Sequence, residues 1–210
     1  MDFPTSSAQE VDGRLSARTA GDDLGARPSS AARERILGAA DRLFYATGVR
    51  AVGVDRVIAE AQVARMTFFR HFPTKDDLVA AFLRRRVRLA EQALAHVEAE
   101  HPGDARAVLA FFAAGTSSER SRPGFRGCEF INTSAEFCDP EHPARRVTAA
   151  HRAWITTKLC EALTQLGRPD PRTTAEALLM LRTGAIVGSS LEGLTTDEET
   201  FERVWWALVG

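Results

Sequence analysis

The sequence predicts an all-α protein of about nine helices. Apolar residues recur three and four positions apart along most of the 210-residue chain, which is the spacing of one helix face. Capping residues, glycines and prolines separate these segments. No segment between turn residues keeps the alternation of apolar and polar residues that marks a half-buried strand.

The first 29 residues are rich in Ser, Ala, Gly, Asp and Arg and have little apolar periodicity. This composition predicts a disordered N-terminal arm over 1–29. Ser29 or Ser30 is expected to cap the first helix, which covers 32–47 and ends before Gly48. The helical part of the chain therefore starts at about residue 30.

Two short helices follow, over 54–61 and 64–72. Gly53 opens the first, and Pro73 ends the second because proline cannot continue a helix. The short connection around 61–63 leaves room only for a tight turn. Two short helices joined in this way predict a helix-turn-helix.

Longer helices make up the rest of the chain. Thr74 is expected to cap a helix over 75–100, with Asp77 as the acidic partner of a capping box. Asp139 and Pro140 are interpreted as an N-cap followed by a first-turn proline. The remaining helices are predicted over 104–118, about 127–138, 141–166, 171–192 and 197–209.

Charge is unevenly distributed along the chain. Residues 31–75 hold eight Lys and Arg against four Asp and Glu, whereas residues 89–210 hold twelve against seventeen. A basic block in a chain of net charge −1 indicates a polyanionic partner for that block alone. The alternative is an ordinary solvated basic face.

The cysteine count and the apolar segments indicate in which cellular compartment the protein is found. Cys128, Cys138 and Cys160 are an odd number, which fits a reducing compartment better than a disulfide framework. The first residues, MDFPTSSAQEVDG, lack the apolar core of a secretory signal. Arg182 and Glu192 interrupt the longest apolar run. We therefore expect a soluble cytoplasmic protein without a membrane span.

The second helix of the helix-turn-helix, ARMTFFRHF, combines aromatic and basic residues. At 100° per residue, one face carries the aromatics that pack on the first helix and the other carries the cations. The inward residues are expected to be Val63, Phe68 and Phe72. The residues free to face DNA are expected to be Arg65, Met66, Phe69 and Arg70, with Thr67 and His71 at the margins.

Over roughly residues 31–82, the stretch RERILGAADRLFYATGVRAVGVDRVIAEAQVARMTFFRHFPTKDDLVAAFL resembles the DNA-binding region of TetR-family transcriptional repressors. Its VARMTFFRHFPTKDDL portion is the most specific part. Two positions depart from the family pattern: Gln62 replaces the turn glycine, and Phe69 replaces a tyrosine whose hydroxyl commonly reaches phosphate.

The resemblance implies roles for individual residues. Arg65 and Met66 lie where the family reads bases, and arginine suits guanine O6 and N7. Thr67, His71 and Lys75 lie where it contacts phosphates. The residues expected to bind DNA are Arg65, Met66, Thr67, Phe69, Arg70, His71, Lys75 and Arg50.

The resemblance also implies a two-part organisation, with a DNA-binding domain over 30–76 and a ligand-binding and dimerisation domain over 77–210. Such a protein is a homodimer that regulates transcription, here expected to be a repressor released from a palindromic operator by a small, mostly apolar effector. We expect no cofactor and no catalytic residue. The alternative is an all-α carrier or helical enzyme, which would not need to bind duplex DNA.

The stretch RGCEFINTSAEFCDPEHPARR resembles one found in a branch of these regulators. Asn132 and Glu136 share a mostly apolar helix face there, so Glu136 needs a hydrogen-bonding partner. They are interpreted either as polar groups of a ligand pocket or as an internal network between helices. The candidate ligand-binding residues are Phe111, Phe112, Cys128, Asn132, Glu136, His151, Trp154 and Met180.

The last two helices carry a candidate dimer interface, because small and apolar residues form a stripe along each. The alternative is packing within one chain. The candidate interface residues are Ala177, Leu181, Gly184, Gly188, Phe201, Val204, Trp205 and Leu208. No metal site is expected, because the Cys, His and acidic residues near 128–151 show no CxxC, HxxxH or HExxH spacing.

Overall fold

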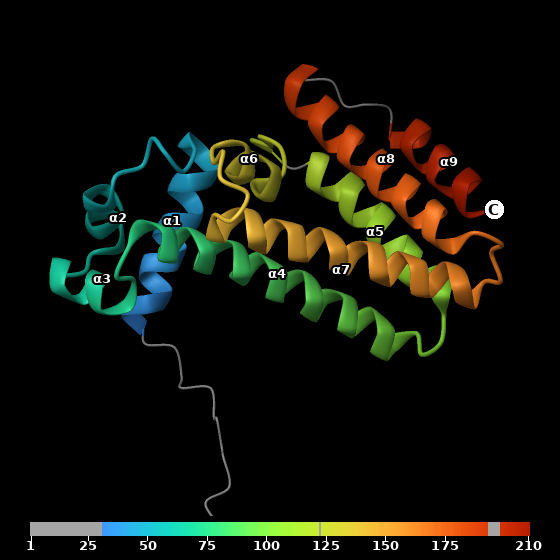
Figure 1. The fold of residues 1–210 in the computed structure, drawn as a ribbon, viewed down its shortest axis with the longest axis horizontal. Helices are drawn as coiled ribbons and strands as arrows, with labels where there is room; N and C mark the ends of the chain where they lie inside the picture. Colours follow the sequence, from blue (N-terminus) through green and yellow to red (C-terminus); the bar gives the residue numbers. More distant parts are fainter. Residues whose placement is uncertain (1–30, 122, 193–197) are drawn as a thin grey trace, which may run out of the picture.

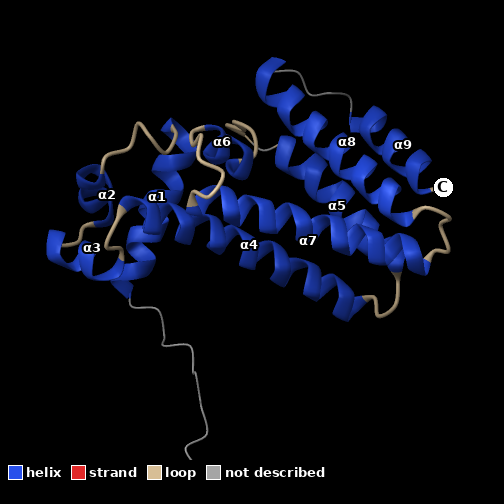
Figure 2. Cartoon of the chain, in the orientation of Figure 1, coloured by secondary structure: helices blue, strands red, loops and turns tan. Residues whose placement is uncertain are grey.

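The computed structural model of the chain describes residues 31–121, 123–192 and 198–210. These residues form nine α-helices and no strand (Figures 1 and 2), so the predicted all-α class is confirmed. The expected arm over 1–29 and the caps Ser29 and Ser30 lie outside the described residues. None of the described helices combines the length and the apolar character needed to span a bilayer.

Every described helix except α6 begins and ends within two residues of its predicted segment. The helices are α1 (Ala31–Thr47), α2 (Val54–Ala61), α3 (Arg65–His71), α4 (Lys75–Glu100), α5 (Ala105–Arg120), α6 (Glu129–Ala135), α7 (Pro143–Gln165), α8 (Pro171–Glu192) and α9 (Glu198–Val209).

Helices α1, α2 and α3 lie together at one end of the molecule (Figure 1). Their apolar faces meet in one core, in which Ile36 and Phe44 of α1 pack with Phe68 of α3. This core continues into the first turns of α4 through Leu78 and Phe82. Burial of these large side chains fixes α2 and α3 on α1.

The long helix α4 leads from this end into a bundle with α5, α7, α8 and α9 (Figure 1). It begins with the predicted capping box, in which the Asp77 amide donates to Thr74 Oγ1 and the Thr74 amide donates to Asp77 Oδ2, both at 3.0 Å. A second core fills the bundle and includes Leu94, Leu159 and Trp205. Helix α4 thus takes part in both cores.

The connection between α5 and α7 differs from the prediction. Helix α6 covers seven residues instead of the expected 127–138, because Gly127 takes a left-handed φ of 90° and cannot continue a helix. The N-cap of α7 is His142, whose Nδ1 accepts from the Ala144 amide at 3.2 Å, and Pro143 is the first helical residue. The interpretation of Asp139 and Pro140 as this N-cap was therefore wrong.

Candidate functional site

Helices α2 and α3 form a helix-turn-helix whose turn is centred on Gln62. This residue has φ 51° and ψ 50°, and its amide donates to the Ala59 carbonyl at 3.2 Å. Glycine adopts this left-handed conformation freely, whereas it costs another residue about 1–2 kcal/mol. Gln62 therefore keeps the tight turn expected of glycine at this position.

Helix α3 has a buried face and an exposed face. Phe68 is fully buried and Phe72 is 2% exposed, as the helical spacing predicts. Met66 is 81% exposed, and Arg65 and Arg70 are also exposed. The aromatic side chains therefore hold α3 in place, and the exposed face offers two cations and one flexible apolar side chain.

Arg65 is held by neighbours on its own domain. Its guanidinium forms an ion pair with Asp55 of α2 and lies 5.3 Å from the centroid of the Phe69 ring. Phe69 is half-buried and packs against the core. Phe69 is therefore not free to face outward as expected, whereas Arg65 is exposed as expected but is paired with Asp55. These contacts orient the Arg65 side chain along the exposed surface.

The N-terminus of α4 lies directly after α3 and carries Lys75. Burial lowers the pKa of the Lys75 ammonium group, and the carboxylates of Glu136 and Asp76 oppose that shift. Thr67 and His71 are half-buried beside the exposed face of α3, and Arg50 is exposed. A helix N-terminus with a neighbouring ammonium group is suited to hold a phosphate.

Glu136 ends α6 and joins it to the loop after α1. Its two carboxylate oxygens accept from the amides of Val49 at 2.8 Å and Arg50 at 2.6 Å. Gly48, with φ 88°, allows this approach, because a Cβ there would lie 3.1 Å from Glu136 Oε1. Glu136 therefore has the hydrogen-bonding partners that its apolar helix face requires, and they are backbone amides of the loop after α1. This agrees with the interpretation of Glu136 as part of an internal network.

The candidate ligand residues do not line a single cavity. Asn132 and Glu136 line one of about 420 Å³ between the end of α1 and α6. Cys128 and His151 line another of about 630 Å³. Asn132 also donates to the Arg126 carbonyl at 2.7 Å. Asn132 and Glu136 therefore lie beside one cavity and His151 beside another.

His151 stacks between two aromatic rings. Its centroid lies 4.3 Å from that of Phe130 and 5.5 Å from that of Trp154. Burial, with smaller contributions from Arg182 and Arg152, lowers the pKa of His151 to about 4. The imidazole is therefore neutral at pH 7.

Phe111, Phe112, His151 and Trp154 also surround a smaller cavity of about 110 Å³. These four residues are brought together as the sequence predicts. Met180 is separate from them, because its side chain points outward from α8 and is 67% exposed. The assignment of Met180 to the pocket was wrong.

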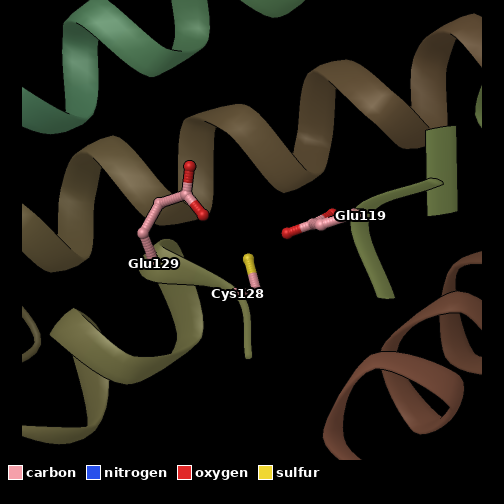
Figure 3. Close-up of side chains that lie close together, drawn as sticks. All are labelled: Glu119, Cys128 and Glu129. Atoms are coloured by element: carbon pink, nitrogen blue, oxygen red, sulfur yellow. The ribbon is translucent and has the colours of Figure 1, made fainter. Parts of the chain in front are cut away.

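The cavity of about 630 Å³ beside Cys128 and His151 has more charged residues in its walls than the sequence predicted. Figure 3 shows the carboxylates of Glu119 and Glu129 close to the Cys128 sulfur in the wall of this cavity. Arg86 Nε lies 3.3 Å from Glu129 Oε1, and Arg182 Nη2 lies 3.3 Å from Glu119 Oε2. All four residues line this cavity. Sequence reasoning missed all four of these residues, because nothing in runs such as LRRRVR shows which charged side chain faces inward.

The candidate dimer residues divide into three groups by exposure. Phe201 is 2% exposed and Trp205 is fully buried in the core of the same chain, so they cannot meet a partner and their assignment was wrong. Gly184 of α8 and Val204 of α9 are exposed, as is the unassigned Leu191 of α8, which is 79% exposed. The remaining residues, Ala177, Leu181, Gly188 and Leu208, are half-buried.

Comparison with known proteins connects these features to one family. Residues 36–82 match the family described as "Bacterial regulatory proteins, tetR family". SCO4454, a TetR-family transcriptional regulator from Streptomyces coelicolor, has a crystal structure that is 40% identical, with a TM-score of 0.71 over 85% of this chain and 92% of that chain.

Two further relatives extend the comparison. The transcriptional repressor NemR of Escherichia coli (strain K12) is 24% identical over 73% of this chain and 81% of its own length. The multidrug binding protein EbrR, solved in complex with malachite green, is 28% identical, with a TM-score of 0.64 over 85% of this chain and 98% of its own. The chain belongs to the TetR family, as the motif predicted, and is a DNA-binding transcriptional regulator and not an enzyme.

Proposed function

We propose that two copies of this chain bind a palindromic operator and that a small molecule in the cavity of about 630 Å³ releases them. TetR-family regulators bind operators, dimerise and bind effectors. The observation that carries the proposal is the exposed face of α3, where Met66 is 81% exposed beside two exposed arginines. Because its target is DNA, we propose that the regulator acts in the cytoplasm.

The operator contacts are proposed for residues 30–76, the DNA-binding domain, with α3 in the major groove. Arg65 would read a guanine edge and Met66 a thymine methyl group. The flanking phosphates would be held by Lys75, Thr67, His71 and Arg50. The rest of the DNA-binding surface would be formed by Phe69 and Arg70. Phosphate contacts position the protein, whereas base contacts give specificity.

The dimer is proposed to form through α8 and α9 of residues 77–210. A two-fold axis there would present two copies of α3 to successive major-groove segments, about 34–36 Å apart. Gly184 of α8 and Val204 of α9 are exposed and so available to a partner. Ala177, Leu181, Gly188 and Leu208 are half-buried and would contribute the edges of their side chains.

The effector is proposed to be more polar than the sequence indicated. Its cavity is lined by Arg86, Glu119, Glu129, Arg182 and the neutral His151, together with Phe130 and Leu89. A ligand there needs polar atoms to meet these groups, because an unpaired buried polar group is unfavourable. The multidrug binding protein EbrR, which shares this fold, was solved in complex with malachite green, which supports a small-molecule effector for this chain.

Arg86 offers a route from this cavity to the DNA-binding domain. It lines the cavity and also contacts Asp41 of α1, with Nη2 at 2.8 Å from Oδ1. A ligand that draws Arg86 or Glu129 into the cavity would weaken this contact with α1. A tenfold loss of DNA affinity needs about 1.4 kcal/mol of preference for the released state.

The test is a comparison of operator-binding variants. Arg65→Ala is expected to cost about 1–3 kcal/mol and to relax preference at one base position. Lys75→Ala is expected to weaken binding to all DNA sequences by a similar factor and to reduce the salt dependence of binding. The control is Arg172→Ala, an exposed arginine at the start of α8 that pairs with Glu176.

Gel-shift titrations on an operator selected from genomic fragments, at several salt concentrations, provide the measurement. An unchanged ranking of operator variants in Arg65→Ala would contradict the base-reading role. Selected fragments without an inverted repeat would contradict the two-fold arrangement.

A further inference from the structure

Asp55 of α2 pairs with Arg65, the residue of α3 that is proposed to read a base. The Asp55 carboxylate accepts a hydrogen bond from the Arg65 guanidinium and forms an ion pair with it. The other acidic residues between 31 and 75 pair with arginines of α1 or α4, and they are Glu34, Asp41 and Glu60. Asp55 instead reaches the first residue of α3.

Arg65 is held from two sides. Its guanidinium carbon lies 5.3 Å from the centroid of the Phe69 ring, one turn further along α3. Phe69 is itself fixed by an edge contact with the buried Phe68, with ring centroids 5.2 Å apart. Arg70, the other arginine of α3, is exposed and has no ion pair within the described part of the chain. The restraint therefore applies to Arg65 and not to every cation of this helix.

The Asp55 carboxylate is unfavourable for DNA affinity. The Asp55 side chain is 81% exposed, and ion pairs between exposed side chains contribute little to folding. A negative charge on the surface that meets DNA also repels the phosphates. Asp55 is therefore expected to weaken binding to DNA of any sequence, and an advantage can come only from the selection of bases.

An oriented guanidinium selects a base better than a free one. Guanine O6 and N7 accept from two parallel N–H groups of arginine, so the guanidinium plane must be fixed for this contact. An arginine loses rotamer freedom when it becomes fixed, and the ion pair imposes that loss before DNA binds. Asp55 accepts from Nη1, which leaves Nε and Nη2 available for a base. The pair also holds Arg65 back from phosphates, which carry no sequence information.

We propose that Asp55 is a positioning residue that sets the preference of Arg65 for guanine. It acts through Arg65 and contacts no base itself. This role rests on the proposed function, because it concerns an operator contact of α3. Helical spacing could not indicate it, because Asp55 and Arg65 are ten residues apart and lie in different helices.

The test compares variants of the full chain on an operator selected from genomic fragments. The base position read by Arg65 is identified as the one where Arg65→Ala relaxes the preference, and operators with each of the four bases there are titrated. The wild-type protein is expected to prefer guanine by about 5–150-fold. Asp55→Asn removes the charge and keeps the size, and it is expected to reduce this preference by about 2–10-fold. The same variant is expected to bind random-sequence DNA about 2–5-fold more tightly at low salt.

Glu60→Gln is the matched control. Glu60 lies on the same helix and pairs with Arg42 Nη2 of α1 at 2.8 Å, so this variant removes an equal charge without changing a partner of Arg65. Its preference for guanine is expected to equal that of the wild type.

Two further variants separate positioning from structure. Asp55→Glu keeps the carboxylate and is expected to keep most of the guanine preference. Asp55→Asn in an Arg65→Ala background is expected to change the base preference no further, because the two residues act as one unit. The melting temperatures of all these variants are expected to be close to that of the wild type.

Wild-type guanine preference in Asp55→Asn, with Arg65→Ala still relaxed at the same position, would overturn the positioning role alone. A preference changed by Asp55→Asn at another position would also overturn it, because Asp55 would then contact a base directly. If Arg65→Ala relaxes no position, the proposed base contact of Arg65 is wrong and this role is wrong with it. A wild-type protein without a preferred sequence would contradict the proposed operator binding itself.

Discussion

The helix-turn-helix and the cavity of about 630 Å³ differ in how the chain builds them. In α3, seven consecutive residues supply both the buried aromatic and the exposed cations. The cavity walls come from α4, α5, α7 and α8 and from the start of α6. A contiguous surface can be recognised from a short pattern. A surface assembled from distant segments depends on how the helices pack.

The largest expected effect tests which residues of α9 are structural. Trp205 is fully buried, so Trp205→Ala is expected to destabilise the fold by about 3–5 kcal/mol. Val204→Ala, at the next position and 39% exposed, is expected to leave the stability of one chain nearly unchanged and to weaken the dimer. Urea unfolding and analytical ultracentrifugation distinguish the two. A destabilised Val204→Ala variant would show that α9 packs differently.

The second prediction tests the lowered pKa of the buried His151 imidazole. An unfolded chain protonates His151 below its ordinary pKa of 6.5, whereas the folded chain does so below about 4. Stability is therefore full above pH 6.5 and is lost as pH falls from 6.5 to 4, by at most about 3 kcal/mol.

His151→Gln is expected to flatten this part of the pH profile. Arg182 and Arg152 oppose protonation of His151. Urea unfolding between pH 7 and 4.5 provides the measurement, with the exposed His101→Gln as control. Equal slopes in the wild type and His151→Gln would show that the ring titrates in the folded protein as it does in the unfolded chain.

The third effect tests the contact between α6 and the loop after α1, which Glu136 makes. Replacing its carboxylate in Glu136→Gln weakens the hydrogen bonds from the Val49 and Arg50 amides, and we expect a loss of roughly 1–2 kcal/mol in stability. Glu141→Gln, at an exposed position in the same connection, is the control. Equal melting temperatures for the two variants would contradict a structural role for Glu136.

The smallest effect tests the turn of the helix-turn-helix. Gln62→Gly is expected to stabilise the fold by up to about 1 kcal/mol, because glycine relieves the left-handed backbone. Gln62→Ala keeps the unfavourable conformation and should not stabilise. A clear fall in melting temperature for Gln62→Gly would reveal a contact made by the Gln62 side chain.

Sequence reasoning was most successful where structure is local. The helix bounds, the capping box at Thr74 and the burial of Phe68 and Phe72 follow from nearest-neighbour rules. The sequence predictions were wrong where the same apolar pattern suits two different orientations of a helix. Phe201 and Trp205 form an apolar stripe that suits a dimer interface as well as an intrachain core, and only the position of the bundle decides between them.

Helix α6 has a consequence for local unfolding. Isolated helices shorter than about 12–15 residues are marginal in water, and α6 has seven. Its helical state therefore depends on anchors outside itself, among them Glu136 at one end and the Glu129–Arg86 pair at the other. Loss of either anchor is expected to open α6 before the long helices around it, so its amide protons should exchange with solvent earlier than theirs. Because Phe130 of α6 belongs to the first core, such an opening would also expose part of that core to solvent.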